Sequence, residues 1–175
     1  DFPDAQGDVL KNFENVTIEG SLNIIVTGDD QNNKIITGSG NDTIVGGAGN
    51  DWIFAGDGVD TVSGNDGNDT VFASFGNDLE DGGPGVDTFA VTGTSSLFTD
   101  VTYDLETGGA YVTGETPNAG KFTNFENFTG GMDFNGNLSG SSWNFTIRGT
   151  GGDNVIITSN GNDTITGGSG NDWIF

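Results

Sequence analysis

Residues 37–90 decide the fold, and in lines of nine they read TGSGNDTIV, GGAGNDWIF, AGDGVDTVS, GNDGNDTVF, ASFGNDLED and GGPGVDTFA. The fourth residue of every line is glycine and the sixth is aspartate. The eighth residue is apolar in five of the six lines and is Glu80 in the fifth line. A nine-residue period kept over six consecutive lines predicts a solenoid in which each line forms the same structural unit.

The pattern extends beyond these six lines on both sides. GDDQNNKII precedes them from Gly28, with Asn33 in the sixth position. Further along the chain come GTGGDNVII from Gly149, TSNGNDTIT from Thr158 and GGSGNDWIF from Gly167, whose sixth residues are Asn154, Asp163 and Asp172. The sequence therefore predicts two arrays, at residues 28–90 and 149–175, which together make up about half of the chain.

The residue types at these spacings suit one chemistry. Glycine tolerates positive φ, so a loop can curl and turn its backbone carbonyls toward a common point. The aspartate adds a charged oxygen, and calcium prefers roughly six to eight hard oxygen ligands. The three residues around the eighth position form a short strand, with the apolar side chain facing the core. The pattern predicts calcium loops alternating with short strands, whereas a flexible linker has no reason to keep an apolar residue every nine positions.

The pattern closely resembles the GGxGxDxUx nonapeptide of the repeats-in-toxin (RTX) family, also called hemolysin-type calcium-binding repeats. The resemblance implies an all-β, right-handed parallel β-roll, in which two nonapeptides form one coil and neighbours on one edge lie 18 residues apart. About six calcium sites are then implied, between Asp42 and Asp60, Asp51 and Asp69, Asp60 and Asp78, Asp69 and Asp87, Asn33 and Asp51, and Asn154 and Asp172. The last two pairs are weaker, because asparagine offers only a neutral oxygen. The candidate ligands are thus Asp42, Asp51, Asp60, Asp69, Asp78, Asp87, Asp163, Asp172, Asn33 and Asn154.

The composition favours cations as partners. The chain has 26 acidic and 4 basic residues and a formal net charge of −22. Such a chain repels itself as well as nucleic acid and anionic membrane surfaces. A thin row of isoleucine and valine cannot offset the chain entropy of about 1–2 kcal/mol per residue while stacked carboxylates repel. We therefore predict that the chain is disordered without calcium and folds when calcium binds.

The segments outside the arrays also have β character. Residues 1–27 form lead-in β coils, and residues 91–148 form an irregular β segment in which VTYDLETGGAYV predicts a hairpin turned at 107–109. The simplest architecture is one continuous roll that these coils thicken, and a small separate sandwich at 91–148 is the alternative. Glu80, beside Leu79, suggests a local register shift or a weakening of the array.

A second, longer repeat lies above the nonapeptide. PDAQGDVLKNFENVT from Pro3 resembles PNAGKFTNFENFT from Pro117, and each copy leads into an array that contains GNDWIF. The offset is 112 residues at Phe13 and Phe125, which places one unit at about 1–114 and the start of a second at about 115. The second array is cut off at residue 175, and we therefore predict that the chain is a slice of a longer tandem protein.

Aromatic residues mark a candidate contact surface. The seventh and ninth positions of a nonapeptide flank the inward eighth position and should face outward. This predicts exposed rings at Trp52, Phe54, Phe72, Trp173 and Phe175, which would contact another copy, an adjacent repeat unit or an extracellular polysaccharide. The alternative is that segment 91–148 folds over them.

Catalysis is poorly supported, because the chain has no histidine or cysteine and no serine in a nucleophile motif. Two functional classes remain: a calcium-binding structural or adhesive module of a large tandem-repeat bacterial protein, assembling as a surface layer, filament or stalk, and an accessory module of a secreted enzyme or toxin. Loops of this kind should fill at extracellular calcium, and the resemblance implies type I secretion to the cell exterior or surface. N-x-T sequons inside the loops, at Asn41, Asn68 and Asn162, favour bacterial over eukaryotic secretion.

Overall fold

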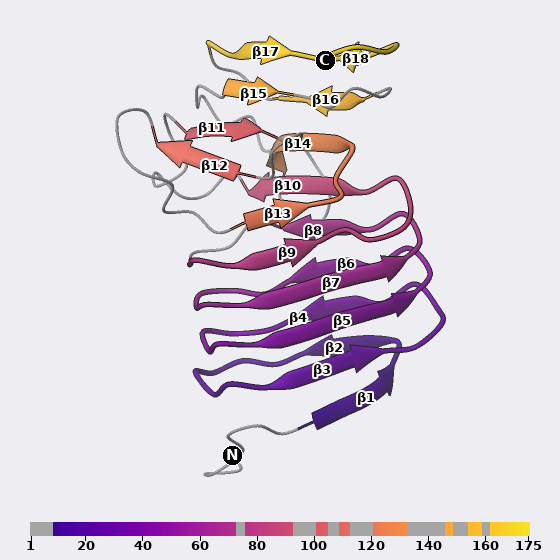
Figure 1. Ribbon diagram of the computed structural model, residues 1–175. Coiled ribbons are helices and arrows are strands. Elements are labelled where there is room, and N and C mark those ends of the chain that lie inside the picture. The colour runs from indigo at the N-terminus through magenta and orange to yellow at the C-terminus, as the bar shows by residue number, and fades with distance from the viewer. Residues whose placement is uncertain are drawn as a thin grey trace.

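The computed structural model describes residues 9–72, 76–92, 101–104, 109–112, 121–132, 146–148, 154–158 and 162–175. These residues form an all-β parallel solenoid whose coils stack from the N-terminal to the C-terminal end (Figure 1). None of the described segments is a helix long and apolar enough to cross a membrane. The expected β-roll is therefore confirmed.

The strands form two sheets, one on each side of the roll. The ten-stranded sheet runs in the order β1 (Val9–Phe13), β3 (Ile25–Gly28), β5 (Thr43–Ala48), β7 (Thr61–Asp66), β9 (Leu79–Asp81), β13 (Lys121–Thr123), β12 (Gly109–Val112), β11 (Val101–Asp104), β15 (Thr146–Arg148) and β17 (Thr164–Thr166). The eight-stranded sheet runs in the order β18 (Trp173–Ile174), β16 (Val155–Ile157), β14 (Asn127–Met132), β10 (Thr88–Thr92), β8 (Thr70–Phe72), β6 (Trp52–Phe54), β4 (Lys34–Ile36) and β2 (Asn15–Thr17).

Successive nonapeptides alternate between the two sheets, so parallel neighbours lie 18 residues apart. In the ten-stranded sheet Ile44 of β5 pairs with Val62 of β7. In the eight-stranded sheet Ile53 of β6 pairs with Val71 of β8. Two nonapeptides therefore make one coil.

The core is a double row of the eighth residues of the nonapeptides. Each sheet contributes a column of inward side chains that are at most 1% exposed: Val26, Ile44 and Val62 from one sheet, and Ile35, Ile53, Val71 and Ile156 from the other. Burying a side chain of this size contributes about 1.5–3 kcal/mol. The core is thus narrow, with one large apolar side chain per strand, and it cannot absorb many unpaired buried charges.

Glu80 interrupts the inward column without a change of register. β9 continues the pairing of β7, with Leu79 opposite Thr61 and Glu80 opposite Val62. Leu79 is 47% exposed and Glu80 is 5% exposed. The local shift that the sequence suggested at this position is therefore wrong: backbone pairing on both sides of β9 holds the alternation and directs the carboxyl group inward.

The described strands between the two arrays join the same sheets. β10 pairs with both β8 and β14, and β13 pairs with β9 in parallel. β11 and β12 form the predicted antiparallel hairpin, while residues 105–108 of its turn lie outside the described residues. These strands continue the roll, and the described part of the segment does not form a separate sandwich.

Phenylalanines widen the core where the first array ends. Phe89 stacks on Phe122 with ring centroids 4.4 Å apart and lies edge-on to Phe125 at 5.5 Å. Phe128 is fully buried beside them. These larger rings fill the space between β10 and the strands that the chain forms when it returns at residue 121.

Candidate calcium loops

The sixth residues of the nonapeptides form a ladder along each edge of the roll. The Oδ1 atom of each aspartate accepts a hydrogen bond from the backbone N–H of the sixth residue one coil earlier. Asp69 Oδ1 accepts from Asp51 at 2.8 Å, and Asp60 Oδ1 accepts from Asp42 at 2.8 Å. The same bond joins Asn33 to Asp51, Asp60 to Asp78 and Asp69 to Asp87 at 2.7–2.8 Å. Each expected pair is therefore brought together by one bond of the ladder.

The second carboxylate oxygen is left without a partner. The Oδ2 atoms of Asp42, Asp51, Asp60, Asp69 and Asp87 are buried and have no hydrogen-bond partner among the described residues. These side chains are at most 2% exposed. An unpaired buried carboxylate oxygen is costly, so five of them in one narrow roll indicate that a ligand of positive charge belongs there.

Glycine keeps the space in front of these oxygens open. A β-carbon at Gly46 would overlap Asp51 Oδ2 and lie 2.8 Å from the carbonyl oxygen of Gly64. A β-carbon at Gly64 would overlap Asp69 Oδ2 and lie 2.5 Å from the carbonyl oxygen of Gly82. A carboxylate oxygen and a carbonyl oxygen of the next coil thus converge at each of these glycines.

The loop glycines also supply the expected backbone freedom. Gly49 and Gly67, the fourth residues of their nonapeptides, have φ of 104° and 143°. Such values are readily adopted only by glycine. The predicted curl of the loop is confirmed at these positions.

Burial and repulsion between carboxylates raise the pKa values of four ladder residues. The pKa of Asp60 is raised to about 7, chiefly by burial and further by the charges of Asp78 and Asp42. The pKa values of Asp51, Asp69 and Asp87 are raised to about 6, again mainly by burial. The hydrogen bonds of the ladder lower these pKa values but do not outweigh burial. A bound cation would favour the ionised form of these carboxylates and lower their pKa values again.

The donor set fits calcium better than other metals. Within the described ranges no three His, Cys, Asp or Glu side chains lie close enough together to hold a metal by themselves. An ion in these loops must therefore take several ligands from backbone carbonyls. Mixed carboxylate and carbonyl oxygens are typical ligands of calcium, whereas zinc prefers the imidazole and thiolate groups that this chain lacks.

Two asparagines and two aspartates of the second array extend the ladder, but the asparagines carry no charge and the aspartates are less buried. Asn33 is buried, but its Oδ1 already accepts the N–H of Asp29 at 2.9 Å. The N–H of Asn154 donates to Asp172 Oδ1 at 3.1 Å. Asp163 and Asp172 are half-buried. Asp78 is 5% exposed, like the other ladder residues of the first array.

The aromatic surface of the first array is less exposed than expected. Phe72 is only 3% exposed, so its predicted exposure is wrong. Its ring lies 5.3 Å from Trp52 and 6.4 Å from Phe54 between centroids, and both of these rings are half-buried. Aromatic side chains of adjacent strands cover one another, which the outward direction of a single position does not reveal. Trp173 and Phe175 are each 65% exposed, as expected.

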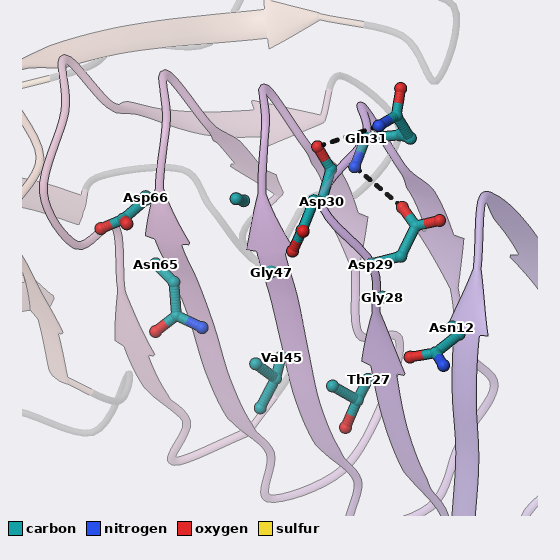
Figure 2. Close-up of a pocket in the computed structure, with 11 residues that line it drawn as sticks. Asn12, Thr27, Gly28, Asp29, Asp30, Gln31, Val45, Gly47, Asn65 and Asp66 are labelled. Carbon is teal, nitrogen blue, oxygen red and sulfur yellow. Dashed lines mark hydrogen bonds between the residues drawn. The ribbon is translucent and has the colours of Figure 1, made fainter.

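A shallow groove on the outer face of the ten-stranded sheet was not predicted. Figure 2 shows its floor on neighbouring parallel strands, with Thr27 and Val45 among the lining residues and Asp30 and Asp66 near its upper end. Asp29 accepts the N–H of Gln31 at 2.8 Å. The pKa of Asp29 is lowered, first by the hydrogen bond from the Asn33 side chain and then by that from Gln31. These bonds order the loop after β3.

Glu126 is a ladder residue that the nonapeptide pattern missed. Its Oε2 atom accepts the N–H of Asp87 at 2.8 Å, across 39 residues of sequence. The available signal was the NFEN motif, which occurs at residues 12–15 and 124–127. In the sequence this motif marks the longer repeat, and its spacing alone does not indicate a ligand.

Fold and loops together define a β-solenoid protein built on calcium-binding loops. The family described as RTX calcium-binding nonapeptide repeat matches residues 27–62, 55–89 and 146–175, which is more than half of the chain. The chain therefore belongs to the RTX calcium-binding nonapeptide repeat family, and it is a calcium-binding repeat module. A comparison with curated proteins found no match.

Proposed function

We propose that calcium ions bind between the paired ladder residues and that their binding drives folding of the roll. The observation that carries the proposal is the column of buried, unpartnered Oδ2 atoms at Asp42, Asp51, Asp60, Asp69 and Asp87. Asp78 belongs to the same column, and Asn33, Asn154, Asp163 and Asp172 extend it with weaker or more exposed groups. The Gly64 and Gly82 carbonyls, which converge with Asp51 Oδ2 and Asp69 Oδ2, are the backbone ligands that the loop geometry favours.

Charge gives the physical reason for coupling calcium to folding. Six ions would change the formal net charge from −22 to about −10. In the absence of a cation, folding must bury carboxylates whose pKa values rise to about 6–7 against a core of one apolar residue per strand. The ions supply the compensation that the narrow core lacks.

We further propose that the module serves a structural or adhesive role in a secreted or surface-exposed bacterial protein made of tandem units. The two NFEN motifs support this proposal, because they adopt equivalent conformations. Asn12 and Asn124 have left-handed φ values of 58° and 57°. β2 begins at Asn15 and β14 begins at Asn127, so each motif ends at the first residue of a strand of the eight-stranded sheet.

A secreted module would meet calcium only after export, so the acidic chain would remain unfolded until it left the cell. Trp173 and Phe175, with centroids 6.0 Å apart, form an exposed aromatic pair suited to contact with another unit or with polysaccharide. The role proposed here is binding and assembly rather than catalysis.

A calcium titration followed by far-UV circular dichroism, with light scattering on the same sample, tests the proposal. We expect a coil-to-β transition between sub-millimolar and millimolar calcium, accompanied by increasing scattering. The same transition without scattering would contradict self-assembly and favour an accessory role in a secreted enzyme or toxin. A chain that is fully folded in excess chelator would contradict the coupling of calcium to folding.

A further inference from the structure

The aspartate ladder continues beyond the last nonapeptide of the first array. The N–H of Asp69 donates to Asp87 Oδ1 at 2.7 Å, and the N–H of Asp87 in turn donates to Glu126 Oε2 at 2.8 Å. β14 pairs with β10 so that Asn127 lies opposite Thr88, the seventh residue of its nonapeptide. Glu126 therefore takes the place of the sixth residue in the next coil, although the chain reaches it only after 39 residues.

A backbone carbonyl from the same segment completes the arrangement. A β-carbon at Gly82 would overlap the carbonyl oxygen of Asn124 and lie 2.8 Å from Asp87 Oδ2. The Asn124 carbonyl thus stands where the carbonyl of Gly82 stands for the preceding loop, at Gly64. Two bonds fix this carbonyl: Asn124 Nδ2 donates to Asp81 Oδ1 at 2.7 Å, and the N–H of Gly82 donates to the Thr123 carbonyl at 3.0 Å.

The site has an unpartnered buried oxygen of its own. Asp87 is fully buried, and its Oδ2 has no hydrogen-bond partner among the described residues. The backbone N–H of Asp87 donates to a second carboxyl group, that of the half-buried Glu126. Two carboxylates and an aligned carbonyl are a calcium donor set, and their repulsion without an ion would push the returning segment away.

Glutamate suits this position because the backbone here makes a hydrogen bond that an ordinary coil lacks. In the regular loops, the N–H of the seventh residue donates to the carbonyl of the sixth residue one coil earlier, as Thr88 does to Asp69 at 2.8 Å. Here both Glu126 and Asn127 donate to the Asp87 carbonyl, at 3.1 and 2.9 Å. The backbone turns around that carbonyl, and the longer side chain of glutamate still reaches the ladder.

We propose that Asp87, Glu126 and the Asn124 carbonyl form a further calcium site, which fastens the returning segment 121–128 to the end of the first array. The proposal rests on calcium binding by the array itself. The segment carries Phe122, Phe125 and Phe128 into the core, so this ion links closure of the ladder to burial of the aromatic cluster. It also joins the first array to the strands that lead into the second, because Phe128 pairs with Ile156 of β16.

The substitution Glu126→Gln distinguishes the effect of the negative charge from the effect of the side chain's shape. Glutamine keeps the size of the side chain and an oxygen that accepts the Asp87 N–H, but it removes the negative charge. Glu19→Gln is the matched control, because Glu19 is exposed and belongs to the lead-in coils. Glu126→Asp retains the carboxylate and matches the residue type found in the regular ladder.

Calcium stoichiometry of the full chain by native mass spectrometry at saturating calcium, with hydrogen exchange of residues 121–128, tests the proposal. We expect Glu126→Gln to bind one ion fewer than wild type and its segment to exchange at least tenfold faster, while Glu19→Gln keeps the wild-type count. An unchanged count and unchanged protection in Glu126→Gln would overturn the site, as would loss of the ion in Glu126→Asp but not in Glu126→Gln. A wild-type chain that binds no calcium would instead refute the proposed function.

Discussion

Replacing Asp69 with asparagine perturbs the ladder where its geometry is most complete. Asp69 Oδ1 accepts the N–H of Asp51, and its own N–H donates to Asp87. Its Oδ2 is buried without a hydrogen-bond partner among the described residues, and it lies where a β-carbon at residue 64 would overlap it. Asparagine retains an acceptor for the ladder bond but places an uncharged amide where the second oxygen stood. The substitution therefore removes ligand charge with little change in shape.

The expected magnitude follows from the number of sites that share this side chain. Asp69 belongs to the proposed sites with Asp51 and with Asp87. A site filled at a calcium concentration one hundred times its Kd stabilises the fold by about 2.7 kcal/mol. Loss of both sites should therefore lower the free energy of unfolding by about 5 kcal/mol at that calcium concentration.

Urea unfolding at pH 7.5, followed by far-UV circular dichroism in calcium and in chelator, measures the effect. In chelator the variant should retain at least as much β signal as wild type, because it no longer buries a carboxyl group whose pKa is raised to about 6. Asp66→Asn, which removes the same charge from an exposed position, is the control and should change stability little. Equal losses for Asp69→Asn and Asp66→Asn in calcium, or equal losses of Asp69→Asn with and without calcium, would refute the reasoning.

The pKa values of Asp51 and Asp60 are raised to about 6 and about 7, so calcium affinity should increase as pH rises through this range. Titration calorimetry at pH 5.5 and 7.5 measures this difference. Equal affinities at the two pH values would show that the ladder is not the calcium site. A raised folded-state pKa stabilises the protonated fold, so the metal-free chain should have most β structure below about pH 4 and lose it as pH rises through 6–7, as circular dichroism can measure. Glu80→Leu removes a buried carboxyl group with an unpartnered Oε1 and should raise the free energy of unfolding by about 1–3 kcal/mol in urea titrations. A destabilised Glu80→Leu variant would show instead that this carboxyl group has a favourable partner in the fold. Gly64→Ala should weaken calcium binding measured by calorimetry, since its methyl group would overlap Asp69 Oδ2; unchanged affinity would place the ion elsewhere.

The regular part of this protein could be predicted from its sequence. The nine-residue period predicted a solenoid with an inward column containing Ile44 and Val62. The resemblance to the RTX nonapeptide implied the parallel roll and the pairing of aspartates 18 residues apart. The physical reason is that each coil contacts only its neighbours, so every residue of the array has the same environment one coil away. A repeated environment selects a repeated residue type, and the repeat is visible in the sequence.

The irregular features were decided by tertiary structure. Glu80 keeps the inward direction because the backbone pairing of β9 outweighs the preference of one side chain. Phe72 is buried because rings on adjacent strands cover it, which the direction of its own position does not predict.

Glu126 joins the ladder because β14, which follows it, pairs with β10 and so places Glu126 in the next coil, 39 residues after Asp87. The NFEN motif was visible in the sequence, but its place in the column was not. A fixed spacing specifies contacts only while the chain winds regularly. Where other strands intervene in the sequence, the pairing of β14 with β10 determines which carboxyl group completes the ladder.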